Sequence, residues 1–256
     1  MLRNVLVISS SGLLLFSKEF VNAAEQPRLL GSVITAMLEK AKQTTGLQLS
    51  YMEFSKLAIT IVGNEPKTVF CVLFHDCDDG EEFGKLLATE ILGAFLNNYR
   101  NDLKSIGLNQ NAFQDFQFQL SSVIQDTGRP VLDELKRNRA VVLALLVKED
   151  PRVGDSCISY STGEVDQFGV LANLKPLISA ATDIMSLRQD SANAVWLEST
   201  PTRASRLLVQ KVVVGTYLVI QFSMRFDHAH YEGEVVRATR LLEKVCMLGE
   251  MMKRNV

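Results

Sequence analysis

Residues that carry chemistry are scarce in this sequence. Its 256 residues include three histidines, one tryptophan and only four cysteines. No Cys-x-x-Cys spacing occurs, so the cysteines are typical of reduced cytosolic thiols rather than of a disulfide framework. No apolar run reaches the roughly 18 residues that a membrane-spanning helix needs. The net charge of -2 excludes the basic footprint of a nucleic-acid-binding protein and a polybasic membrane patch.

The shortage of histidine also restricts hypotheses about catalysis. A Ser-His-Asp or Cys-His arrangement would have to use a loop histidine, and no Gly-x-Ser-x-Gly segment exists to present a nucleophile. The segment 80–85 superficially resembles a phosphate-binding loop. However, three residues rather than four separate its glycines, and Leu86 follows Lys85 where a serine or threonine is required. We therefore predict a non-enzymatic protein without a bound cofactor.

Two segments contain side chains that can bind metals. His75 to Asp79 follow one another at a strand end, where adjacent side chains point to opposite faces and cannot all reach one ion. His228 and His230 stand at alternate positions with Glu232 nearby, which would suit a surface metal site. Loop histidines without further ligands are more often solvated. We predict no metal site and keep a metal-binding or small-molecule sensor as an alternative.

The N-terminal region has two interpretations. Arg3, the apolar stretch 5–16 and the small residues Ala23 and Ala24 imitate a signal peptide. Residues 9–12, which are three serines and a glycine, interrupt the apolar stretch, and two charged residues follow it. A Ser/Gly turn between two β-rich runs is typical of a hairpin. We therefore favour strands at 4–9 and 13–20.

Hydrophobic periodicity predicts an α/β protein in which one order of elements occurs twice. Over residues 1–138, further strands are expected at 49–54, 57–62 and 68–75, with helices at 27–45, from 83 to about 96, and at 111–138 with a break near Gly128 and Pro130. Over residues 139–256, strands are expected at 141–147, 157–160, 194–198, 206–213 and 216–226, a turn at 150–155, and helices at 171–187 and 234–252.

Local matches favour a duplication. Residues 68–74 align with residues 216–222, and residues 87–90 align with residues 237–240. The alternative is that two unrelated α/β units share one order of elements by chance. We predict two tandem units, 1–138 and 139–256, the second divergent and lacking one helix.

The order ββ-α-βββ-α-α, opening with strand residues 2–8 and continuing with 12–16, resembles the longin domain and the related roadblock fold. The resemblance implies two longin-like units, each a five-stranded, mainly antiparallel sheet flanked by helices. It offers no catalytic residues, because such domains act through surfaces, usually the helix after the second strand and an exposed sheet edge. Predicted partner-binding residues are Leu14, Phe16, Phe20, Leu30, Phe113 and Phe116.

The resemblance also implies a function. We expect a cytoplasmic protein-interaction subunit that binds a longin- or roadblock-type partner and a small GTPase in vesicle trafficking or ciliary assembly. Its contact with membranes or the ciliary base would be peripheral, through its complex. A structural adaptor or scaffold without GTPase contact is the alternative.

Two further residue sets have a core or an interface interpretation: Trp196, and the stripe of Phe113, Phe116 and Leu120. The core interpretation is favoured for both.

Overall fold

The computed structural model describes residues 1–21, 27–101, 103, 113–148, 156–161, 167–186, 193–198, 205–223 and 225–254. The predicted turn at 150–155, the small residues at 23 and 24 and the expected helix start at 111 lie outside these ranges. The chain divides into two units, Met1–Thr127 with Leu248–Val256, and Gly128–Met247. The second unit therefore begins at Gly128 rather than at 139.

The first unit contains a five-stranded antiparallel sheet with the strand order β2-β1-β5-β4-β3. The elements in chain order are β1 (Leu2–Ser9), β2 (Leu14–Glu19), α1 (Pro27–Thr45), β3 (Tyr51–Glu53), β4 (Ala58–Gly63), β5 (Val69–His75), the short 3₁₀ helix η1 (Cys77–Asp79), α2 (Gly80–Asn98) and α3 (Phe116–Asp126). The N-terminal hairpin is confirmed: β1 and β2 pair antiparallel where a signal peptide was the alternative.

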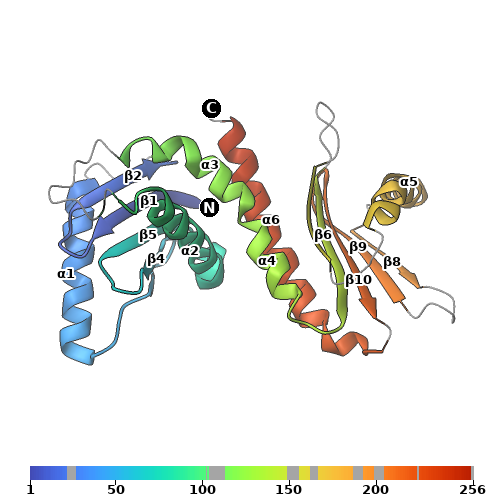
Figure 1. Ribbon diagram of the computed structural model, residues 1–256, viewed down its shortest axis with the longest axis horizontal. Helices are drawn as coiled ribbons and strands as arrows, with labels where there is room; N and C mark the ends of the chain where they lie inside the picture. The colour runs from blue at the N-terminus through green and yellow to red at the C-terminus, as the bar shows by residue number, and fades with distance from the viewer. Residues whose placement is uncertain are drawn as a thin grey trace. The chain divides into compact units, whose positions relative to one another are not determined.

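The central strands β1 and β5 are apolar on both faces, so each face needs a cover. Leu6 and Ile8 of β1 point into a core that α1 completes with Ile34 and Leu38. The alternate residues of β1 point to the opposite face, against which α2 packs. Figure 1 shows α1 and α2 on opposite sides of this sheet. The sheet is therefore the middle layer of three.

The second unit repeats this architecture, with the strand order β7-β6-β10-β9-β8. Its elements are α4 (Gly128–Leu135), β6 (Val141–Lys148), β7 (Ser156–Ser161), α5 (Gln167–Ser186), β8 (Ala194–Glu198), β9 (Ser205–Val213), β10 (Thr216–Ser223), η4 (His228–His230) and α6 (Glu232–Arg254). Leu174 of α5 completes the core on one face of the sheet. The chain thus consists of two longin-like α/β units, as predicted.

The third predicted helix is in fact two helices. α3 ends at Asp126 and α4 begins at Gly128, next to the predicted break. Pro130 lies in the first turn of α4, where a missing N–H costs little. Because α4 packs on β6 and β7, it belongs to the second unit. This assignment moves the boundary, and it supplies the second unit with a helix that it was expected to lack.

Equivalent positions carry equivalent turns in the two units. In both, the last strand is followed by an aspartate in extended conformation, Asp76 or Asp227, and then by a 3₁₀ turn. The N–H groups of Asp79 and His230 each donate to the carbonyl of that aspartate, both at 3.0 Å. The two segments aligned from sequence, 68–74 and 216–222, fall on the equivalent central strands β5 and β10. The residue-by-residue register of that alignment is wrong, however. Phe70 and Val72 face the core that α1 completes, whereas their aligned residues Leu218 and Ile220 alternate with Val219, which faces α5, so aligned side chains point to opposite faces.

A buried polar contact sets how closely α2 approaches the first sheet. The Nδ1–H of His75 donates to the carbonyl of Asp76 at 3.0 Å, because a carbonyl can only accept. In the neutral ring, Nε2 then accepts from the hydroxyl of Thr60 at 2.8 Å. Gly84 of α2 lies directly above this pair, and a Cβ there would stand 2.2 Å from Thr60 Oγ1 and 2.6 Å from His75 Nε2.

None of the helices in the described ranges combines the length and the apolar character needed to cross a bilayer.

The pair Gly84 and Gly93 on α2 tests this packing. We expect Gly84→Ala to lower the free energy of unfolding by about 1–3 kcal/mol, because the added methyl overpacks a buried contact. Gly93→Ala should instead raise it by up to about 1 kcal/mol, because nothing lies within 4 Å of the new Cβ and alanine favours a helix. Urea unfolding of both variants measures the difference, and equal effects of the two substitutions would contradict it.

Candidate functional site

Three of the predicted partner-binding residues are buried in the first unit. Phe16 of β2 meets Phe116 of α3 edge to face, with 5.1 Å between ring centroids. Phe95 of α2 packs against Phe113 and Phe116 at 5.4 and 5.2 Å. Leu120 is also buried, so the core interpretation of the α3 stripe is confirmed. Phe16, Phe113 and Phe116 therefore join β2, α2 and α3 through buried ring contacts, and almost none of their area is accessible.

The other three predicted residues are half-buried. Leu14 and Leu30 pack against the core between α1 and the sheet. Phe20 follows the end of β2, where its N–H donates to the carbonyl of Arg3 at 2.9 Å. Their role in binding stays a prediction, since each retains some accessible surface.

One line of exposed apolar side chains in the first unit lies on the outer side of α1. Leu29, Val33 and Met37 form a line at spacing four and are between 37% and 60% exposed. In the sequence, Leu29, Val33 and Met37 belong with Leu30 and Leu38 to one apolar face of the predicted helix at 27–45. That face is wider than the core requires, because Leu30, Ile34 and Leu38 pack against the core while the neighbouring line stays exposed. The family resemblance pointed to this helix, but the predicted residues did not include its exposed line; the width of the apolar stripe is the signal that could have revealed it.

The candidate phosphate loop and metal segments take ordinary structural roles. Gly80 begins α2, and Glu81 and Glu82 occupy its first turn, where carboxylates favour the helix dipole. His75 is buried in the contact with Thr60 described above. Asp76 bonds Arg3 at 2.7 Å. Although burial raises the pKa of Asp76, hydrogen bonds from the N-terminal amine and Arg3 lower it on balance.

The histidines after β10 do not converge on one point. His228 Nδ1 lies 3.3 Å from Glu232 Oε2. The ring of His230 lies 6.2 Å from Phe226, and its carbonyl accepts from Asn138 at 3.1 Å. In the described ranges no three His, Cys, Asp or Glu side chains gather as a metal site would require.

Trp196 lies at the rim of the second sheet and not in its core. It is 40% exposed on β8, the edge strand, so the core interpretation is wrong. Its ring stacks on Phe222 at 6.0 Å, and Phe222 stacks on Tyr231 at 3.9 Å. His228 contacts the indole at 5.2 Å, and the Arg206 guanidinium lies 5.9 Å from the ring centroid. We call these five residues the Trp196 cluster.

Arg206 connects the Trp196 cluster to the sheet edge. Its guanidinium donates to the hydroxyl of Tyr231 at 2.9 Å and pairs with Glu198 at 2.8 Å. The hydrogen bond to Tyr231 and the nearby Glu198 raise the pKa of Arg206, although desolvation opposes them. The guanidinium therefore stays charged and fixes the edge strand to the turn before α6.

The same edge position is aromatic in the first unit. In the first unit Tyr51 pairs with Thr60, and Thr60 pairs with Leu73 on the next strand. In the second unit Trp196 pairs with Leu208, and Leu208 pairs with Ile220 in the same way. In both units a glutamate follows two residues later, Glu53 or Glu198. The Tyr51 hydroxyl donates to Glu53 at 2.8 Å, and partial burial together with this bond raises the pKa of Tyr51 to about 12.

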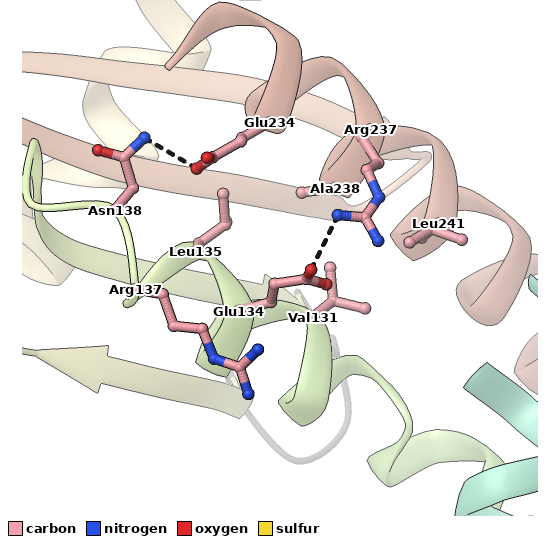
Figure 2. Close-up of a pocket in the computed structure, with 9 residues that line it drawn as sticks. All are labelled: Val131, Glu134, Leu135, Arg137, Asn138, Glu234, Arg237, Ala238 and Leu241. Atoms are coloured by element: carbon pink, nitrogen blue, oxygen red, sulfur yellow. Dashed lines mark hydrogen bonds and ion pairs between the residues drawn. The ribbon is translucent and has the colours of Figure 1, made fainter. Parts of the chain in front are cut away.

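A pocket of about 210 Å³ lies between α4 and α6 in the second unit (Figure 2). Val131, Leu135, Ala238 and Leu241 supply its apolar side chains. Across it, Arg237 pairs with Glu134 at 2.8 Å, and Asn138 donates to Glu234, also at 2.8 Å. The volume is below the roughly 300–1,000 Å³ of typical ligand sites. Since an ion pair and a hydrogen bond already join the two helices across it, we interpret it as the seam where two helices meet.

A double-mutant cycle tests that interpretation. Glu134 and Arg237 are each 47% exposed, so Glu134→Gln and Arg237→Gln should show a coupling energy of about 0.2–1 kcal/mol. The free energy of unfolding from urea titration measures it, with Glu243→Gln on the exposed side of α6 as the matched control. A coupling well above about 2 kcal/mol would contradict a solvated structural pair.

Comparisons with known proteins bear on the fold alone. No family model and no curated protein matches the chain. Solved structures of MglB, a protein of the roadblock/longin fold, do match. Myxococcus xanthus MglB aligns with a TM-score of 0.40 at 18% identity, over 47% of this chain and 94% of that one. MglB with a tetrameric arrangement aligns at 0.41 and 16%, over 49% and 92%.

A gliding protein MglB from Thermus thermophilus aligns with a TM-score of 0.25 at 18% identity, over 29% of this chain and 61% of that one. Scores this low add nothing to the argument from topology. The identical strand order of the two sheets, with a helix between the second and third strands of each, is the longin/roadblock arrangement expected from the sequence.

Proposed function

We propose that this chain is a non-enzymatic interaction subunit that binds another protein of longin or roadblock type. The observation that carries the proposal is the line of Leu29, Val33 and Met37 on α1. Three large apolar side chains in one line on a helix that already has a buried face are typical of a contact surface. A helix of the same architectural kind on the partner would bury them.

The sheet edges support the same proposal. β3 ends the first sheet and β8 ends the second, and each pairs on only one side in the described sheets. A strand of a partner can bond to the backbone groups on the other side. A helix face and an adjoining sheet edge together would make a contact that is both apolar and directional.

We further propose that the assembly acts on a small GTPase in the cytoplasm, in vesicle trafficking or ciliary assembly, and meets membranes through its partners. The absence of an arranged nucleophile and base in the described ranges is compatible with this role but does not establish it. The partner's surface, rather than a pocket of this chain, would contact the nucleotide-binding protein.

The α1 line provides the direct test. Val33→Lys with Met37→Lys should weaken binding to a longin- or roadblock-type partner by more than tenfold, because two apolar side chains worth about 1.5–3 kcal/mol each no longer become buried. The partner is first identified by mass spectrometry of the complex purified from native cells. Affinity is then measured with the two purified proteins.

Gln43→Lys, on an exposed position of the same helix, is the matched control and should bind normally. Unchanged affinity of the double variant would count against the α1 surface. Nucleotide exchange and hydrolysis by a co-purifying GTPase, measured with and without the complex, separate the two functional hypotheses. A stable complex with no effect on either rate would favour the structural scaffold.

A further inference from the structure

We propose that the Trp196 cluster and its two flanking carboxylates bind a basic side chain, lysine or arginine, from an extended partner segment that adds to β8. This inference rests on the proposed interaction function, and it names the chemistry of a second contact surface, distinct from α1.

The indole is held rigidly although it is exposed. Phe222 and Tyr231 are almost completely buried, and the three rings stack in series from the core to the rim. Arg206 bonds to the Tyr231 hydroxyl and thereby fixes the base of this stack. A partner that contacts Trp196 therefore meets a preorganised surface and loses little side-chain entropy in ordering it.

Two ion pairs frame the indole. Arg206 contacts both the ring and Glu198, and His228 contacts both the ring and Glu232. The carboxylate-bearing side chains of Glu198 and Glu232 are 58% and 63% exposed, so each retains oxygen lone pairs that face water. With His228 counted as neutral, Arg206, Glu198 and Glu232 together carry one more negative charge than positive charge. The quadrupole of an exposed aromatic ring attracts a cation to its face, and neighbouring carboxylates attract the same cation by their negative charge.

The edge strand determines how such a cation would arrive. β8 bonds to β9 on one side and is the last strand of the sheet as described. A partner strand would place every second side chain on the face of Trp196 and Glu198. The intervening side chains would lie on the face of Leu197, which is 40% exposed and apolar. The best-fitting segment thus alternates basic and apolar residues.

Trp196 is the sole tryptophan, so its fluorescence reports on this site in the intact chain. The probe is a capped hexapeptide that alternates arginine with valine, and the comparison peptide alternates glutamate with valine. We expect a saturable change in fluorescence with the arginine peptide, at least about tenfold tighter than with the glutamate peptide. Added salt should weaken the binding, because both carboxylates are exposed to solvent.

Glu198→Gln with Glu232→Gln should weaken binding of the arginine peptide about tenfold. Glu65→Gln, an exposed glutamate in the turn between β4 and β5, should leave it unchanged. Trp196→Ala, followed by calorimetry, should also weaken it, and circular dichroism establishes that each variant is folded. These peptide measurements need no cellular partner. An absence of peptide binding would therefore count against the β8 site alone and not against partner binding through α1.

Three results would overturn the proposal. One is equal or tighter binding of the glutamate peptide, which would mean that Arg206 and His228 dominate the site. Another is unchanged binding by the Glu198→Gln and Glu232→Gln double variant. The third is self-association of the chain, measured by analytical ultracentrifugation and abolished by Trp196→Ala, which would make a second copy the occupant of β8.

Discussion

Two-sided burial of the central strands is the constraint on which the rest of this molecule depends. β1 and β5 in one unit, and β6 and β10 in the other, carry apolar residues on both faces. A sheet of this kind is stable only when helices cover both sides, because either bare face would expose a large apolar area. In the first unit α1 and α2 provide those covers, and in the second unit α5 covers one face while α4 packs on β6 and β7.

The same constraint explains where interaction surfaces are left. Leu30, Ile34 and Leu38 cover the sheet, and the neighbouring line of α1 stays exposed among the described residues. The sheet is also finite, so its last strand ends at an open edge. At β8 that edge combines a fixed aromatic ring with carboxylates, and the equivalent position in the first unit, Tyr51 with Glu53, repeats the residue types. The two sheets of equal strand order therefore end in two rims that carry similar residue types.

One buried polar contact in the first unit sets the spacing between a helix and the sheet. His75, Thr60 and the glycine above them are the one place where α2 approaches the sheet more closely than a side chain would allow. The corresponding turn in the second unit has Tyr231 where the first has Gly80, and its ring extends the stack to Trp196. At this position the second unit therefore has an aromatic side chain where the first unit has none.

The sequence by itself determined the strands, the helices and their repetition. Two-residue and three-to-four-residue periodicities are local, so the hairpin at β1 and β2, the helix from Pro27 and the break before Gly128 were all predictable. Only the tertiary structure decided which of two adjacent apolar lines on α1 faces the core, that α4 belongs to the second unit, and that Trp196 lies on an open edge. Periodicity defines a face but not its neighbours, and burial depends on which strands and helices pack beside it.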